Sequence, residues 1–123
     1  MAAAAPEGLI ESIEAGLEKR ALDALGLARR TGEAVLGFDQ VKEALAKGKA
    51  SVLLSASDAA DDGREKLSRL GKELFQHRGL SSAAMSAAFG REGVKHAALL
   101  KGAAADRFRR EAERLDGVRA AAI

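Results

Sequence analysis

Apolar residues recur at helical spacing over the first quarter of the chain. Between residues 7 and 30 they lie three or four positions apart, with acidic and basic residues between them. The apolar set is Leu9, Ile10, Ile13, Leu17, Ala21, Leu22 and Leu25. This spacing predicts one long amphipathic helix that ends near Gly32. We expect Leu9, Ile13 and Leu17 to cover the domain's own sheet; the alternative is that the stripe packs on a partner.

Short apolar segments alternate with further helical patterns. Residues 34–36 (AVL), 50–55 (ASVLLS) and 94–100 are predicted strands, and 76–80 (QHRGL) occupies the place of another despite its low apolar content. Helical patterns cover 39–47, 57 or 58 to about 75, 81 or 82 to 89, and 103 to about 115. This alternation predicts an α/β fold, a three-layer α/β/α sandwich with a four-stranded mixed sheet.

Boundaries and burial follow from the same patterns. Ser57 or Asp58 is expected to cap the third helix. That helix is expected to bury four apolar side chains, those of Leu67, Leu70, Leu74 and Phe75. No repeat or linker divides residues 1–123, so one domain is predicted, with frayed ends at 1–6 and 117–123.

Composition narrows the class of protein. The 123 residues include no cysteine, which excludes disulfides and thiolate zinc sites, and the net charge is only +2. Four Phe with no Tyr or Trp argue against binding of single strands by base stacking. No apolar stretch approaches the roughly 20 residues of a membrane span, and the first eight residues lack a secretory pattern. A cytoplasmic, monomeric protein is expected.

The usual catalytic constellations are missing from the sequence. His77 and His96 lie in different predicted strands, without metal-ligand spacing, and are expected to be packing or surface residues. No serine stands in a G-x-S-x-G elbow, and the Gly48-Lys49 pair lacks the Walker spacing. We therefore expect no enzymatic activity, no metal and no cofactor.

The run LGLARRTGEAVLGFDQVKEALAKGKASVLLSASDA, residues 25–59, is the most informative segment. A glycine opens a helix, a second glycine follows eleven residues later, and an apolar strand then ends in a small residue before an aspartate. Gly37, Gly48, Val52–Leu54, Ala56 and Asp58 fill these places. The run resembles the kink-turn RNA-binding superfamily of archaeal and eukaryotic large-subunit ribosomal proteins and their YlxQ-like bacterial relatives.

A second block, SSAAMSAAFG, extends the resemblance to roughly residues 20–115. In the family a serine starts a short helix that carries an apolar residue and closes on a glycine, as Ser81, Met85 and Gly90 do here. The chain is most similar to the domain that follows a YlxR-type domain in bacterial nucleic-acid-binding proteins implicated in transcription termination. The resemblance implies that a longer natural protein has such an N-terminal domain.

The resemblance implies binding of structured RNA at Gly37, where a residue without a side chain lets the backbone approach phosphate. The helix behind it points free N–H groups at the ligand. Leading contacts would be Gly37, Gln40 and Lys42, and two neighbouring loops would flank them. The complete set of candidate RNA-binding residues is Gly37, Phe38, Asp39, Gln40, Lys42, Glu43, Asp58, Ala60, Leu80, Ser81, Ser82, Arg29, Arg30 and Arg91.

Three positions depart from the family pattern. Asp39-Gln40 stands where the family commonly has Asn-Glu or Lys-Gln, Glu43 replaces a lysine, and Ser82 replaces another. Two acids beside a phosphate backbone oppose binding, so weaker binding of a standard kink-turn is expected.

Two other interpretations remain open at this stage. One is a protein-interaction module within a transcription or ribosome-associated assembly. The other is an accessory substrate-binding domain of an RNA-modifying enzyme, which also predicts no activity for this chain alone.

Overall fold

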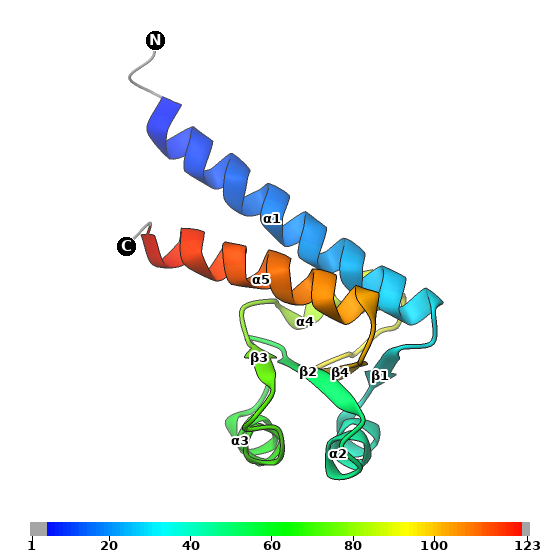
Figure 1. The fold of residues 1–123 in the computed structure, drawn as a ribbon. Helices are drawn as coiled ribbons and strands as arrows, with labels where there is room; N and C mark the ends of the chain where they lie inside the picture. The colour runs from blue at the N-terminus through cyan, green and yellow to red at the C-terminus, as the bar shows by residue number, and fades with distance from the viewer. Residues whose placement is uncertain (1–4, 122–123) are drawn as a thin grey trace.

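A computed structural model gives the fold of residues 5–121, with five helices and four strands (Figure 1). The elements in chain order are α1 (Ala5–Arg30), β1 (Ala34–Leu36), α2 (Phe38–Ala46), β2 (Ala50–Ser55), α3 (Asp61–Leu70), β3 (Phe75–His77), α4 (Ser82–Phe89), β4 (His96–Leu100) and α5 (Ala103–Ala121). Residues 1–4 and 122–123, where frayed ends were predicted, lie outside the described residues.

The sheet has the strand order β1-β4-β2-β3 and is mixed. Strand β4 pairs antiparallel with both β1 and β2, whereas β2 and β3 are parallel. Strands β1, β2 and β3 therefore run in one direction and β4 runs in the other. Their carboxyl ends meet the amino end of β4 at one edge of the sheet.

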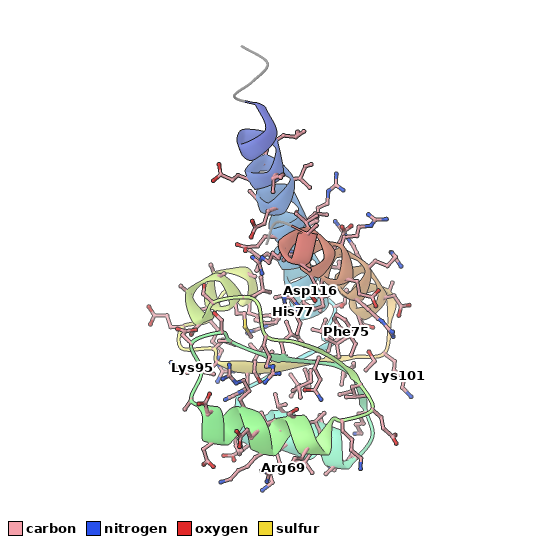
Figure 2. The ribbon with its side chains drawn as sticks, turned by 90° about the vertical axis from the view of Figure 1, so that its left-hand side faces the viewer. Arg69, Phe75, His77, Lys95, Lys101 and Asp116 are labelled. Carbon is pink, nitrogen blue, oxygen red and sulfur yellow. The ribbon has the colours of Figure 1, made fainter. Side chains whose placement is uncertain are left out.

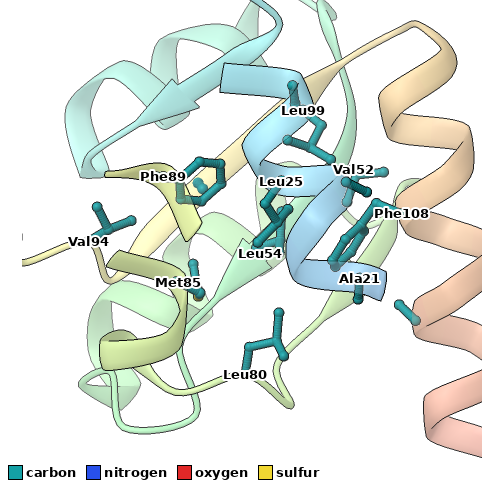
Figure 3. Packing of buried hydrophobic residues seen from close by; sticks show 14 of the residues in the cluster. Ala21, Leu25, Val52, Leu54, Leu80, Met85, Phe89, Val94, Leu99 and Phe108 are labelled. Carbon is teal, nitrogen blue, oxygen red and sulfur yellow. The ribbon is translucent and has the colours of Figure 1, made fainter. Parts of the chain in front are cut away.

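Helices cover both faces of the sheet, which confirms the predicted three-layer sandwich. Figure 1 shows α1, α4 and α5 on one face and α2 and α3 on the other. The larger core lies under α1, α4 and α5, where Leu25, Leu54 and Phe108 are fully buried among other apolar side chains (Figure 3). A smaller core, built on Val41, Leu53 and Leu67, lies under α2 and α3.

The third helix is shorter than predicted. It begins after Ala60 rather than at Ser57 or Asp58, and it ends at Leu70, before Gly71. Phe75 pairs with Val52 in the sheet, so β3 begins where the helical pattern was expected to end. The apolar spacing continues past Gly71 because Leu74 packs against the smaller core and Phe75 against the larger one. Leu74 directly precedes β3 and Phe75 is its first residue, so neither belongs to a helix. Leu70, expected to be buried, is 47% exposed.

The first half of α1 does not cover the sheet. Leu17 is buried, but Leu9 is 59% exposed and Ile13 is 43% exposed, so the expectation that they cover the sheet is wrong. The 26-residue helix is longer than the sheet it crosses, and its first turns project beyond the other layers (Figure 1). Helix periodicity identified the helix correctly but could not show where the sheet beneath it ends.

Helix α5 runs beside α1 and continues to Ala121, past the predicted end near Leu115. Arg119 ties the two helices together. Its guanidinium donates to Glu14 Oε2 at 2.7 Å, to Glu18 Oε1 at 2.8 Å and to the Gly79 carbonyl at 3.0 Å. Residues 117–121, predicted to be frayed, form the last turn of α5, and Arg119 holds this turn against α1.

Candidate nucleic-acid interface

Four segments meet at the edge of the sheet where β1, β2 and β3 end. They are the Gly37 loop after β1, residues 56–60 after β2, residues 78–81 after β3, and residues 91–95 before β4. We call this the Gly37 edge. Because the strand directions fix it, most of the sequence-predicted site is brought together from three distant parts of the chain.

Gly37 has a backbone conformation of φ 95° and ψ 149°, which is accessible almost only to glycine. Its N–H donates to the His96 carbonyl at 3.1 Å, which continues the pairing of β1 with β4, and its carbonyl accepts from Val41 N at 2.9 Å. Gly37 is thus the last residue of the sheet ladder and the N-cap residue of α2. Gly37 has no side chain that could cap α2, so the first N–H groups of the helix receive no side-chain bond from their N-cap residue.

The second loop is fixed to its neighbours by hydrogen bonds. Ala56 N donates to the Lys95 carbonyl and Ser57 N to the Leu80 carbonyl, each at 2.8 Å. Asp58 Oδ1 accepts from Ser82 N at 2.8 Å. This bond and the backbone N–H of Asp58 lower the pKa of the carboxyl, with a further contribution from Lys95. Asp58 is therefore an ionised brace between two loops.

The third loop leads into α4 through Ser81, whose Oγ accepts from Ala84 N at 3.1 Å and caps the helix. Ser82 Oγ donates to the Val94 carbonyl at 3.0 Å. Leu80 is only 1% exposed and belongs to the larger core, so its side chain anchors the loop and does not reach the surface. Among the candidates in these two loops, Asp58, Ala60 and Ser81 are exposed and Ser82 is half-buried.

The first turns of α2 present mostly polar side chains. Asp39, Gln40, Lys42 and Glu43 are all exposed. Glu43 forms an ion pair with Lys47 at 3.2 Å, which partly offsets its charge. Phe38 is half-buried and packs against the smaller core, so it is not an exposed platform for base stacking.

His96, which sequence reasoning treated as a packing or surface residue, is a buried part of this edge. Its ring lies edge-on to Phe38 with centroids 5.7 Å apart, and its Nδ1 lies 3.2 Å from Ser55 Oγ. Burial lowers the pKa of His96, and the nearby Lys95 and Arg64 lower it further. The ring is therefore neutral near pH 7, and it packs against Phe38, the first residue of α2.

Two cations at the Gly37 edge were not predicted as contacts. Lys95 directly precedes β4 and Arg78 directly follows β3, and both side chains are exposed. Figure 2 places Lys95 at the opposite end of β4 from Lys101. The predicted strands could have indicated both residues, because a residue next to the end of a strand must lie at one edge of the sheet.

Three predicted arginines are not brought to the start of α2. Arg29 and Arg30 end α1, which leads into the opposite end of β1, and Arg29 Nη1 donates to the Phe89 carbonyl at the far end of α4. Arg91 lies just beyond that same end of α4. Arg29 and Arg30 therefore lie beside the last turns of α4, whereas Arg91 begins the 91–95 segment of the Gly37 edge.

Comparisons with known proteins identify the fold. No protein-family model matches the chain, and no curated protein is significantly similar to it. A protein of unknown function from Bacillus halodurans superposes with a TM-score of 0.66 and 19% identity, over 80% of this chain and 95% of that chain. The Giardia lamblia 15.5kD RNA binding protein superposes with a TM-score of 0.65 and 16% identity, over 84% of this chain and 90% of that chain. The chain shares its fold with both proteins.

Two further findings concern metal binding and membrane spans. Within residues 5–121, no group of three or more His, Asp or Glu side chains is arranged to hold a metal ion. No helix in that part of the chain is long and apolar enough to cross a membrane.

The second histidine, His77, lies in the layer between the sheet and α5. It is buried, and its Nδ1 is 3.4 Å from Asp116 Oδ2 (Figure 2). Phe108 packs edge-on to its ring. Burial lowers the pKa of His77, a shift that Asp116 opposes and Arg119 reinforces. His77 is thus a core residue, one of the two roles expected for it.

We predict that the fold loses stability as the pH falls below about 6.5, the ordinary pKa of histidine. His77 and His96 have lowered pKa values in the folded state, so the unfolded chain takes up protons first as the pH falls. Each histidine should therefore add to the pH dependence of the free energy of unfolding a slope that corresponds to at most one proton taken up on unfolding. Urea unfolding at pH 7.5, 6.5 and 5.5 measures this, and His96→Gln should flatten the slope. A wild-type free energy that is constant across this range would contradict the prediction.

Proposed function

We propose that the chain is a non-catalytic module that binds structured RNA at the Gly37 edge. The observation that carries this proposal is the uncapped start of α2 at a glycine in a glycine-only conformation. Its free N–H groups and the positive end of the helix dipole form an anion site. Gly37 itself places no side chain in front of that site, and the Gln40 side chain lies beside it. Structural similarity to a protein named for RNA binding supports the same class of ligand.

The charge of the edge favours recognition of RNA shape over general attraction to phosphate. Lys42, Arg78 and Lys95 are exposed cations, while Asp39 and Glu43 are exposed acids beside the helix start. So balanced a surface releases few counterions on binding. A bent or bulged RNA that presents one phosphate to Gly37 and base edges to Gln40 fits this arrangement.

The finer assignments rest on the sequence resemblance. We propose that the RNA contains a bend related to a kink-turn, altered to suit Asp39 and Glu43. We also propose that the protein acts in the cytoplasm, together with the ribosome or the transcription machinery.

A second candidate function is a protein-interaction module. The observation that favours it is the exposure of Leu9, Ile10 and Ile13 on the projecting part of α1. Contiguous exposed apolar side chains are typical of surfaces that contact other proteins.

Filter binding of the protein to structured cellular RNA, at low and moderate salt, tests the main proposal. We expect saturable binding that weakens with salt, and Asp39→Asn should strengthen it by roughly three- to fivefold, the scale of one surface charge interaction. Asp106→Asn is the matched control, because it removes the corresponding first-turn acid from α5. Absence of binding, or equal effects of the two substitutions, would count against a site at the Gly37 edge.

A further inference from the structure

Four large apolar side chains are exposed on the described part of the chain, and they fall in two places. Leu9, Ile10 and Ile13, 59%, 41% and 43% exposed, form a patch on the projecting turns of α1. We call this the α1 patch. Leu70, 47% exposed, lies apart from it at the end of α3. Neither place belongs to the Gly37 edge, so the proposed RNA site accounts for neither.

Leu70 borders a cleft where α2 and α3 end, at the opposite edge of the sheet from Gly37. We call it the α2–α3 cleft; its volume is about 460 Å³, and it is lined by Leu45, Gly48, Ala50, Leu70, Gly71, Lys72, Glu73, Leu74 and Lys101. Figure 2 shows Lys101 at the far end of β4 from Lys95. A cleft of this size can accept large aliphatic side chains from a partner.

The charges around the two places are opposite in sign. Two of the three charged residues that line the cleft are lysines, and neither Lys72 nor Lys101 forms an ion pair with a described side chain. Residues 7–18, which include the α1 patch, contain four glutamates and no lysine or arginine. The cations that follow are Lys19 and Arg20, and Arg20 lines a hollow together with Ile13. Arg119 pairs with Glu14 and Glu18, which leaves exposed Glu11 as a free acid beside the patch among described side chains.

The fold keeps the two places apart within one molecule. Helix α1 packs on one face of the sheet, whereas α2 and α3 pack on the other (Figure 1). The rigid sheet lies between them, so the α1 patch cannot fill the cleft of its own chain. It can reach only the cleft of another copy.

We propose that the α1 patch of one copy docks into the α2–α3 cleft of a second copy. Leu9, Ile10 and Ile13 would cover Leu70 and remove apolar surface of both molecules from water. Glu11 would lie near Lys72 and Lys101 of the other copy. The two surfaces are different, so the contact is head-to-tail and can repeat from copy to copy. So few side chains make a weak, concentration-dependent contact, and it leaves the Gly37 edge of every copy open.

Paired loss-of-contact variants test the proposal. Leu9→Gln/Ile10→Gln/Ile13→Gln removes the patch and keeps good helix formers, while Leu70→Glu/Lys72→Glu closes the cleft to an acidic partner. All five side chains are exposed, so both variants should keep the wild-type circular dichroism and melting temperature. Lys66→Glu, which reverses a charge on α3 outside the cleft, is the matched control. Sedimentation velocity of nuclease-treated protein, up to roughly 1 mM, gives the mass of each species.

We expect wild-type protein and Lys66→Glu to form a concentration-dependent ladder that passes beyond the dimer. Each loss-of-contact variant alone should remain a monomer, since each lacks one half of the contact. Mixed together, they should form a one-to-one complex and nothing larger, because only one intact patch and one intact cleft remain. If either variant fails to fold, Lys101→Glu alone should shift the wild-type ladder to at least about tenfold higher concentration.

Three results would overturn the proposal. Wild-type protein could stay monomeric at every concentration. The cleft variant could associate as well as wild type, which would indicate that α1 pairs with α1. The mixture could contain no one-to-one complex. None of these results depends on RNA, so the RNA proposal stands or falls separately.

Discussion

Gly37→Ala should weaken RNA binding by at least about tenfold and cost about 1–3 kcal/mol of folding stability, the usual cost of forcing a side chain into a glycine-only conformation. The added Cβ would stand on the N-cap residue of α2 and lie 3.1 Å from Gln40 Oε1. It would therefore obstruct both the helix start and a leading contact residue. Fluorescence anisotropy with a structured RNA that wild type binds measures the affinity, and urea unfolding measures the stability.

Gly48→Ala is the matched control for that substitution. Gly48 also has a positive φ, 68°, and it follows the other end of α2 with open space where a Cβ would lie. The substitution should cost stability without changing RNA affinity, since the site would be untouched. Equal losses of affinity for the two variants would show that the Gly37 effect is a general loss of folded protein.

Phe108→Ala should destabilise the fold by about 3–5 kcal/mol, the usual cost of deleting a fully buried aromatic ring. Phe108 joins α5 to the larger core and packs edge-on to His77, with ring centroids 5.8 Å apart. Its loss opens a cavity between α5 and the sheet. Thermal and urea unfolding, followed by circular dichroism, measure the change.

Phe108→Leu should recover much of that loss, because a leucine refills most of the cavity. The same loss of stability in both variants would mean that the edge-on contact with His77, rather than the filled volume, holds α5 in place.

Local patterns were enough to predict most of the elements. Strands 34–36 and 50–55 were predicted with the bounds that the structure shows, because each is apolar and flanked by helix-ending residues. The predictions failed where local and tertiary information differ. The spacing of Leu70, Leu74 and Phe75 is helical, yet Gly71 interrupts the helix and the pairing of Phe75 with Val52 makes the next segment a strand.

The loops of the candidate site were predicted from resemblance, and the structure shows that they meet. The sequence could not reveal their supports, because these depend on contacts across the sheet. The buried His96 beneath Phe38 and the bond from Ser82 to Asp58 join residues at least 24 positions apart. The exposure of Leu9 and Ile13 was missed for a related reason, since helical spacing does not show how far the sheet extends.

The braces between the loops determine which partner must change shape on binding. Asp58 holds Ser82, Ser82 holds Val94, and Ala56 holds Lys95, so the surface around Gly37 is fixed before any ligand arrives. A surface fixed in advance loses little conformational entropy when it binds. An RNA that docks there would have to supply the bending itself. The protein would then select those RNA molecules that can adopt the bound shape with little loss of free energy.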